Sequence, residues 1–519
     1  MRLESLKDAL RRPEAYTHRV DTVELEETHA SLVFLAGSRA YKIKKPVDLG
    51  FLDYSTLDKR QHFCREELRL NRRLAPDVYL EVVPVVGEPP RFADPRRQEP
   101  HAGEPLEWTV VMRRLDPKHH LRRRLAEDRL PPGSIERIAR RLKTFHDEAH
   151  RGDKVDEHAR FSTVRTNALD NFQQRRDDAL QIISESTLEA IEAATRARLE
   201  EARPIIEARH REGRARDTHG DLRLEHIYID DSDDLHIIDC IEFCDAFRYA
   251  DPLLDMAFLA MDLDIRGHHQ RCQKLWHAYL DGDSPTLRPL IDLYCSYRSA
   301  VRAKVHGVKA GDDEVDERAR KKARQLARAH WYYAWWKASP PGEGPALLLL
   351  GGLPASGKST RARKLKERGA VDVVLDSDVI RKQLADEAGR QDEDQDWESG
   401  IYTPEWSRRT YGAMRDQARK ALLDGQRVAV AASFRNDRWR CQFVDLARSL
   451  GLPVRFFECT IDDDLARQRL QGRQDDPSDA NWTIYRSIKE RWEAPSKPIA
   501  PIHRRLSPTE DPGDQWDRS

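Results

Sequence analysis

A phosphate-binding loop motif constrains the fold of the last third of the chain more than any other feature. The stretch LLLLGGLPASGKST at 347–360 fits the pattern GxxxxGK[ST] from Gly352 to Ser359. The glycines of this pattern let backbone N–H groups surround phosphate oxygens, while Lys358 reaches the β- and γ-phosphates and the Ser359 hydroxyl binds Mg²⁺. The apolar run before the motif predicts a buried strand, and the residues after it predict a helix whose amino-terminal dipole attracts phosphate. The expected nucleotide contacts are Gly352, Ala355, Ser356, Gly357, Lys358, Ser359 and Thr360.

An acid and an arginine follow the next apolar stretch. The segment DSDVIRK comes directly after 371–375, and its Asp378 and Arg381 share a helix face if a helix begins near Asp378. An acid at the carboxyl end of a parallel strand lies at the edge of the crevice where α/β proteins bind ligands. We therefore expect Asp378 to accept a proton from a substrate hydroxyl and Arg381 to hold an anionic part of that substrate. The alternative is a helix-capping aspartate with a surface arginine.

Three more arginines follow a third apolar strand, which we expect at 427–432. In the stretch ARQRLQGRQDD, Arg467 is followed by Arg469 and Arg473, and the last two are four residues apart, so that one helix face can carry both. Guanidinium groups above a transferring phosphoryl group neutralise charge that develops in the transition state. We expect a lid that carries Arg469 and Arg473, and the alternative is a solvated basic helix face.

These motifs resemble one group of P-loop kinases. Residues 345–500 are similar to the polynucleotide-kinase, gluconate-kinase and zeta-toxin group, which phosphorylates hydroxyl groups, and the shared features are GLPASGKST, SDVIRK and R-x-x-x-R. In polynucleotide 5′-kinases the acid that matches Asp378 is the general base, and the arginine that matches Arg381 contacts a substrate phosphate. Ala431 stands where related sequences often carry an acid. Any metal-binding role of that acid is absent here or falls to Asp376 or Asp378.

A second catalytic pattern lies upstream of the phosphate-binding loop. The stretch THGDLRLEHIYI at 218–229 is followed by LHIIDCIEF at 235–243. We expect one carboxylate, Asp221, on a loop near the substrate hydroxyl, and a second, Asp239, at a strand end where it holds Mg²⁺. Protein-kinase-like catalytic loops have this arrangement.

The upstream pattern resembles the aminoglycoside and choline phosphotransferase family over about residues 30–335. The family pattern, roughly HGDLHxxN…IDxE, implies that Asp221 is the catalytic base and Asp239 the metal-binding acid. It also implies a lysine that pairs with the α- and β-phosphates, which is Lys44, with Lys42 on the same strand face as the alternative. Three further implied residues are Glu67, the helix acid that holds this lysine, Met112, in the hinge segment VVMRRLD that binds adenine, and Asp255, which braces the catalytic loop.

Two residues depart from the family pattern. Arg223 replaces the usual histidine, and His226 stands where the metal-binding asparagine is expected. Mg²⁺ strongly prefers oxygen ligands, so that Glu225 or Glu242 would have to complete its shell. Otherwise the site binds ATP weakly, or binds it without turnover. The alternative for His226 is a residue at the start of a helix with no metal role.

A proline- and glycine-rich seam, SPPGEGPA at 339–346, divides the chain. We interpret the aromatic cluster WYYAWW at 331–336, just before it, as a helix that packs on a core rather than as a ligand cage. The expected architecture is a bilobal, α+β protein-kinase-like fold of the aminoglycoside phosphotransferase type, followed by an α/β P-loop kinase fold with a parallel sheet. The expected boundaries are 1–338 for the first domain, with lobes at about 24–115 and 116–338, then 339–346 for the linker, 347–505 for the second domain and 506–519 for a disordered tail.

Charge and cysteine content exclude some classes of protein. The chain has 89 Lys plus Arg and 90 Asp plus Glu, so that it is not a general polyanion binder. Basic stretches such as Arg122–Arg124 and Arg408–Arg409 leave nucleic-acid binding open. The seven cysteines form no CxxC pair, and we expect reduced thiols in a cytoplasmic protein. We expect no signal peptide and no membrane span, because the longest apolar run, 346–350, is too short.

The whole chain resembles bacterial fusions of an aminoglycoside-phosphotransferase-like domain with a P-loop ATPase or kinase domain. This resemblance implies an ATP- and Mg²⁺-dependent kinase that moves the γ-phosphate to a hydroxyl of a sugar, a nucleoside or a nucleic-acid 5′-end. One alternative is that the first domain is a degenerate kinase that regulates the second. Another is a nucleotide-driven interaction protein that hydrolyses ATP slowly. The acceptor and the oligomeric state stay open.

Overall fold

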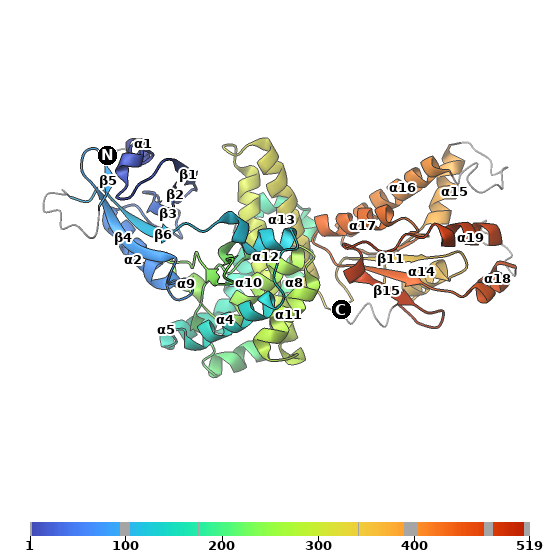
Figure 1. Ribbon diagram of the computed structural model, residues 1–519. Coiled ribbons are helices and arrows are strands. Elements are labelled where there is room, and N and C mark those ends of the chain that lie inside the picture. Colours follow the sequence, from blue (N-terminus) through green and yellow to red (C-terminus); the bar gives the residue numbers. More distant parts are fainter. Residues whose placement is uncertain are drawn as a thin grey trace. The chain divides into compact units, whose positions relative to one another are not determined.

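The computed structural model describes residues 3–93, 104–174, 176–340, 342–388, 403–471 and 481–512. It divides into two compact units, and the course of the chain can be followed by colour in Figure 1. The first unit contains Met1–Val164, Ile205–Leu263 and Arg271–Pro285, and the second contains Arg165–Pro204, Asp264–Gln270 and Thr286–Ser519. The second unit therefore includes helices that precede the seam at 339–346, and the domain boundaries given above stay predictions.

The first unit begins with a six-stranded antiparallel sheet in the order β1-β2-β3-β6-β4-β5. Its strands are β1 (Val23–Glu27), β2 (Ser31–Ala36), β3 (Arg39–Lys44), β4 (Tyr79–Val86), β5 (Arg91–Phe92) and β6 (Glu107–Arg113). Strands β2 and β3 form a hairpin, whose turn uses Gly37 at a φ of +59°. Residues two apart on a strand share a face, and therefore Tyr41 and Ile43 enter the buried core while Lys42 and Lys44 point to the opposite side.

Helix α2 (Leu57–Asn71) packs against β4 and β6. It begins at Thr56, whose side chain accepts a hydrogen bond from the Lys59 N–H and so satisfies one free donor of the first turn. The other helices up to the seam are α1 (Leu3–Leu10), α3 (Leu121–Ala126), α4 (Ser134–Glu148), α5 (Asp153–Asp156), α6 (Phe161–Gln173), α7 (Arg176–Leu180), α8 (Glu185–Arg211), α9 (Asp245–Arg248), α10 (Pro252–Ile265), α11 (His269–Leu280), α12 (Arg288–Gly311) and α13 (Glu317–Ala338).

Two short ribbons carry the upstream catalytic pattern. Strand β7 (Arg216–Asp217) pairs with β10 (Tyr249–Ala250), and β8 (Ile227–Ile229) pairs with β9 (Leu235–Ile237). Asp221 lies on the loop between β7 and β8, and Asp239 lies two residues after β9. Because β8 and β9 are antiparallel, the start of β8 and the end of β9 lie at the same end of this hairpin, and both carboxylates belong to that end.

Helix α13 belongs to the second unit and carries the aromatic cluster before the seam. Trp331, Tyr332 and Tyr333 are almost completely buried, which confirms the interpretation that they pack on a core. The Tyr332 hydroxyl donates a hydrogen bond to the Leu423 carbonyl at 2.6 Å. Gly425 lies against the Trp335 ring so closely that a Cβ there would be 2.1 Å from a ring carbon.

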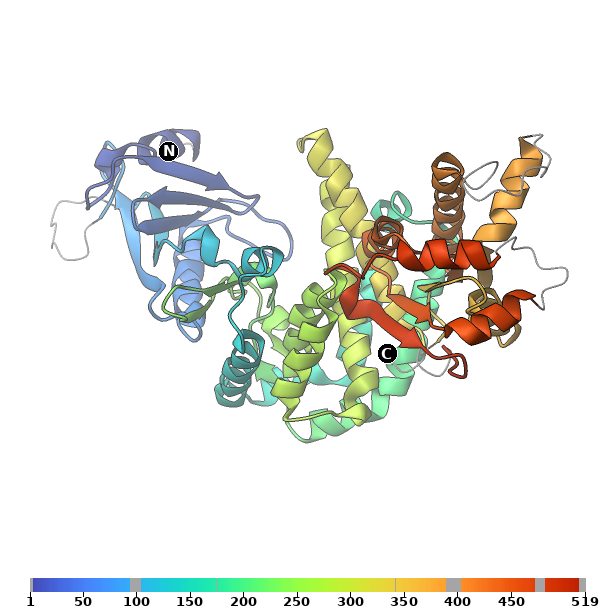
Figure 2. The same ribbon diagram turned by 45° about the vertical axis from the view of Figure 1, so that its right-hand side comes forward.

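The second unit contains a five-stranded parallel sheet in the order β12-β13-β11-β14-β15, seen from a second side in Figure 2. Its strands are β11 (Ala346–Gly352), β12 (Val373–Asp376), β13 (Arg427–Ala431), β14 (Val454–Cys459) and β15 (His503–Leu506). Its helices are α14 (Lys358–Glu367), α15 (Ser377–Glu387), α16 (Pro404–Leu423), α17 (Asp437–Ser449), α18 (Asp463–Gln471) and α19 (Trp482–Glu490). The predicted parallel sheet is confirmed, with β11 buried along its whole length between β13 and β14.

Candidate functional site

The phosphate-binding loop joins β11 to α14 and depends on its glycines. Gly352 has a φ of +146°, and a Cβ on it would lie 2.5 Å from the Cys459 carbonyl oxygen and 2.6 Å from the Ser356 hydroxyl. Gly357 and Ala355 also have positive φ angles, of +84° and +62°. Ala355 is held in a conformation that costs a non-glycine residue roughly 1–3 kcal/mol. Strained backbone conformations of this kind are typical of ligand-binding loops.

The buried hydroxyl of Ser356 fits a phosphate ligand. Its oxygen is inaccessible and has no hydrogen-bond partner among the described residues. A buried hydroxyl without a partner is costly, so that it marks a position where a ligand can satisfy it. The unpartnered Ser356 hydroxyl and the lack of space for a side chain at Gly352 both fit a loop that binds the nucleotide phosphates predicted from the motif.

A cavity of about 240 Å³ opens beside the loop and brings together three of the predicted catalytic residues, Lys358, Asp378 and Arg381. Asp376 caps α15, because its carboxylate accepts a hydrogen bond from the Asp378 N–H at 2.9 Å. The capping role proposed as an alternative for Asp378 therefore belongs to Asp376, and the Asp378 side chain is left in the cavity wall.

The far wall of this cavity is basic and aromatic, and most of it was not predicted from the sequence. Its arginines are Arg381, Arg408, Arg435 and Arg438, and Asp378 is the acidic residue among the described lining residues. The Tyr411 and Trp439 rings stack in the same wall at 4.6 Å, and the Arg438 guanidinium lies 4.2 Å from the Trp439 ring. The signal in the sequence was the segment SFRNDRWR directly after β13, at the edge of the sheet where the phosphate-binding loop also lies.

The predicted lid is described only in part. Arg469 on α18 donates to the Ala355 carbonyl at 3.0 Å, so that it reaches the phosphate-binding loop. Arg473 lies outside the described residues. Arg361, which the sequence did not single out, donates to the Ser356 and Ser507 carbonyls at 2.8 and 2.7 Å. It fixes the loop against the start of the segment that was predicted to be a disordered tail.

The oxygen groups around the loop fit Mg²⁺. Ser359 lies in the first turn of α14, Asp376 is the last residue of β12, and Asp378 lies in the first turn of α15. These side chains offer the hydroxyl and carboxylate oxygens that Mg²⁺ prefers. Ala431 is buried at the end of β13 and offers no ligand. The Ser433 hydroxyl, two residues further on, lines the cavity.

In the first unit, Glu67 holds both candidate lysines of β3. Its Oε1 forms an ion pair with Lys42 at 2.8 Å, and its Oε2 accepts a hydrogen bond from Lys44 at 2.7 Å. Burial alone would raise the pKa of Glu67, but the two lysines hold it below its usual value. Lys42 also donates to Asp239 at 3.1 Å, whereas Lys44 is fully buried and contacts Glu242 and the Tyr54 hydroxyl. Lys42 is therefore the lysine beside the predicted metal-binding acid.

The predicted hinge residue Met112 lies on β6, opposite Ala40 on β3 and Tyr79 on β4. Its side chain is nearly buried in the apolar cluster that also contains Ala40 and Val110. Ile238, which immediately precedes Asp239, packs against the same cluster. The structure therefore places Met112 in the apolar cluster that also holds the residue preceding Asp239, the predicted metal-binding acid.

Asp255 braces the catalytic loop, as the sequence predicted. Its fully buried carboxylate accepts hydrogen bonds from the backbone N–H groups of His219, at 2.6 Å, and Gly220, at 2.9 Å. Gly220 cannot be replaced without strain, because its φ is +84° and a Cβ would lie 2.9 Å from the Phe247 carbonyl. Burial lowers the pKa of His219 to about 4, so that this ring is neutral, and its Nε2 lies 3.0 Å from the Ile238 carbonyl.

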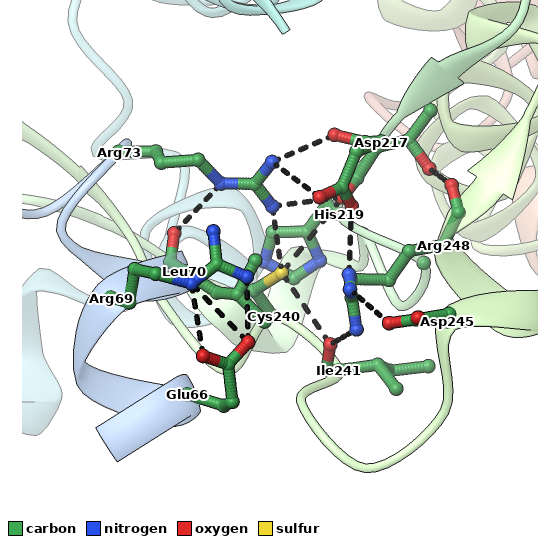
Figure 3. A network of polar contacts seen from close by, with 12 residues as sticks. Glu66, Arg69, Leu70, Arg73, Asp217, His219, Cys240, Ile241, Asp245 and Arg248 are labelled. Atoms are coloured by element: carbon green, nitrogen blue, oxygen red, sulfur yellow. Dashed lines mark hydrogen bonds and ion pairs between the residues drawn. The ribbon is translucent and has the colours of Figure 1, made fainter. Parts of the chain in front are cut away.

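Two arginines that the sequence did not single out hold the loop from the other side (Figure 3). Arg248 is buried and donates to Asp217, Ile241 and Asp245 at 2.7–2.9 Å. Arg73, at the end of α2, donates to the carbonyl of Asp217 at 2.7 Å and contacts the Cys240 sulfur at 3.2 Å. These bonds tie the catalytic loop to the segment that follows Asp239, and Cys240 acts as a buried thiol in this network.

The candidate base Asp221 is tied to Arg223. Both carboxylate oxygens accept from the guanidinium, each at 2.9 Å, and Arg223 also donates to Glu225 at 2.8 Å. The His226 Nδ1 lies 2.8 Å from the Asp221 carbonyl oxygen, and its Nε2 lies 3.0 Å from Arg223 and 3.4 Å from Asp239. Asp221, Asp239 and His226 are thus brought together, with Arg223 among them.

These residues fit Mg²⁺ poorly. Asp221 is engaged by Arg223, so that the predicted ligand pair Asp239 and His226 offers one carboxylate and one ring nitrogen that already accepts from Arg223. No group of three His, Cys, Asp or Glu side chains in the described part of the chain is arranged to hold a metal ion. The replacement of the family's asparagine by His226 thus leaves this site without a second oxygen ligand at that position.

Comparisons with known proteins agree with the two folds. The model of the phosphotransferase enzyme family matches residues 23–290, and that of an AAA domain matches residues 347–495. Over 473 residues the chain is 30% identical to uncharacterized proteins of Mycobacterium tuberculosis (strain ATCC 25618 / H37Rv) and Mycobacterium bovis (strain ATCC BAA-935 / AF2122/97), and each match covers 90% of both chains.

Solved structures resemble each part separately. A choline/ethanolamine kinase family protein from Mesorhizobium loti is 16% identical, with a TM-score of 0.36, and the match covers 64% of this chain and 98% of that one. A gluconokinase from Sinorhizobium meliloti 1021 is 15% identical, with a TM-score of 0.23, and the match covers 34% of this chain and 88% of that one. No helix in the described ranges combines the length and the apolar character needed to cross a membrane.

Proposed function

Since the chain belongs to the phosphotransferase enzyme family and also carries an AAA domain, we propose that its second domain, residues 347–505, is an ATP-dependent kinase that acts on a hydroxyl group. The observation that carries this proposal is the shared cavity of Lys358, Asp378 and Arg381. A phosphate grip, a carboxylate and a guanidinium in one cavity are the groups that phosphoryl transfer to an alcohol requires.

Each residue has a definite role in this proposal. The phosphate-binding loop and Lys358 hold the β- and γ-phosphates, and Asp378 accepts the proton of the incoming hydroxyl. Arg381 and Arg469 stabilise charge on the transferring group or on the acceptor. Ser359 and Asp376 would hold Mg²⁺, which neutralises phosphate charge when it is bound.

The basic wall favours an acceptor that carries an anionic group. Arg408, Arg435 and Arg438 join Arg381 around a cavity in which Asp378 is the one acid among the described lining residues. Guanidinium groups bind phosphate and carboxylate oxygens in two-point contacts, and they gain little from a neutral or cationic molecule. We therefore propose a phosphorylated sugar, a nucleotide or a nucleic-acid 5′-end as the acceptor class, rather than a neutral sugar or an aminoglycoside.

Transfer of radiolabelled γ-phosphate to a panel of acceptors tests this proposal. The panel pairs neutral compounds with their anionic counterparts, for example a nucleoside with its 3′-phosphate and a sugar with its phosphate. We expect kcat/KM to be at least about tenfold higher for the anionic member of each pair. Equal values would contradict the acceptor class, and release of the label only as inorganic phosphate would favour the nucleotide-driven interaction protein.

A second function, regulation by the first unit, is favoured by the contact between Arg223 and Asp221. A carboxylate whose two oxygens both accept from one guanidinium is a weaker base toward a hydroxyl proton, because the ion pair stabilises its charged form. We propose that the first unit binds a nucleotide without transferring its phosphate, and that it regulates the second domain. The test compares the transfer of radiolabelled γ-phosphate by Asp221→Asn with that by Lys358→Ala, and we expect only Lys358→Ala to lose it.

A further inference from the structure

Arg223 introduces a positive charge between the Asp221 carboxylate and the His226 ring. Its guanidinium makes four hydrogen bonds, two to Asp221, one to Glu225 and one to His226. A guanidinium has five N–H groups, so that one N–H is left without a partner among the described residues. The side chain is 14% exposed, and it is therefore open to a ligand on one side.

A second cation lies on the other side of Asp239. The Lys42 ammonium is 3.1 Å from Asp239 and is 17% exposed, while the Asp239 side chain is 46% exposed. Lys42 and Arg223 thus approach the same carboxylate region, Lys42 directly and Arg223 through His226. A divalent ion at Asp239 would lie next to the Lys42 ammonium, and like charges a few ångströms apart repel strongly in a partly buried site.

We propose that the upstream site binds a nucleoside triphosphate without a divalent cation, and that Lys42 and Arg223 supply the positive charge for its phosphates. The poor fit of Asp239 and His226 to Mg²⁺ and the presence of two partly exposed cations lead to the same conclusion. Asp221 and Glu225 keep the Arg223 guanidinium in a fixed orientation, so that little side-chain freedom is lost when a phosphate binds. The inference rests on the second function proposed above and is independent of transfer by the second domain.

The experiment uses the full-length Lys358→Ala protein, in which the phosphate-binding loop has lost its lysine. ATP is added in EDTA or in excess MgCl₂, and hydrogen exchange is followed in the segments 39–44 and 218–229, which locate the nucleotide in the upstream site. We expect ATP to protect both segments in EDTA, with an apparent Kd within about threefold of that in MgCl₂. Arg223→Ala should weaken this protection in EDTA by about tenfold or more.

Arg122→Ala is the matched control, because Arg122 also contacts Glu225, at 2.5 Å, but makes no contact with Asp221 or His226 in the described structure. Its protection should equal that of the parent protein. Protection that requires MgCl₂, or that Arg223→Ala leaves unchanged, overturns the metal-independent site. Absence of protection in both solutions overturns nucleotide binding by the first unit altogether. Neither failure affects the second domain, whose transfer is measured separately in the wild type.

Discussion

Asp378 and Asp386 lie on the same helix in different surroundings. Asp378 faces the cavity beside Lys358, whereas Asp386 is exposed near the end of α15. A positioned general base typically contributes about 10²–10⁴-fold to the rate. We therefore expect Asp378→Asn to lower kcat by about this factor while the affinity for ATP changes less than about threefold. Steady-state kinetics of ADP formation check this, and Asp386→Asn is the control; equal kcat values for the two variants would contradict the role of Asp378.

Gly352 and Gly412 differ in the space around their α-carbons. A Cβ on Gly352 would lie 2.5 Å from the Cys459 carbonyl, at a φ that other residues rarely adopt, whereas nothing lies within 4 Å of a Cβ on Gly412 in α16. We expect Gly352→Ala to lower the free energy of unfolding by about 1–3 kcal/mol. Gly412→Ala should raise it by about 0.5–1 kcal/mol, because alanine favours the helix. Urea unfolding followed by circular dichroism measures both, and a neutral Gly352→Ala would show that the loop is not strained as described.

At the scale of elements, the loop between β7 and β8 contains a pH-dependent contribution to stability. Burial holds the pKa of His219 at about 4, below its ordinary 6.5. Between pH 6.5 and pH 4 the unfolded chain therefore binds a proton at this histidine and the folded chain does not. The free energy of unfolding therefore falls as the pH drops from about 6.5 to about 4. We expect this fall to be shallower in His219→Asn than in the wild type, measured by urea unfolding at a series of pH values. Parallel curves would contradict the neutral buried ring.

The sequence predicted elements and local motifs well because their signals lie within a few residues. The loop from Gly352 to Ser359, with the strand before it and the helix after it, is such a feature. It favoured Lys44 over Lys42, which lies on the same strand face, and only the fold shows that Lys42 is the lysine beside Asp239. The basic wall of the cavity depends on residues from α15, α16 and the segment after β13, and no sequence pattern joins them.

At the scale of the whole molecule, the compact units divide the chain before the seam. Helix α13 buries Tyr332, whose hydroxyl donates to the Leu423 carbonyl, and its Trp335 ring lies against Gly425, so that these contacts are all within residues 286–519. Exposing a large buried side chain costs about 1.5–3 kcal/mol. A fragment of residues 286–519 should therefore unfold at a higher urea concentration than one of residues 345–519. Equal midpoints would show that α12 and α13 add nothing to the stability of the part of the chain after the seam.

The central claim is that phosphate is transferred in the second domain and that the first unit does not transfer it. The most direct measurement is transfer of radiolabelled γ-phosphate to the anionic acceptors by full-length Lys358→Ala and Asp221→Asn. We predict that Lys358→Ala lowers transfer by about 10²-fold or more, because the lysine grips the phosphate that moves. Asp221→Asn should leave the set of labelled products unchanged. Loss of a labelled product in Asp221→Asn, or full transfer by Lys358→Ala, would contradict this account.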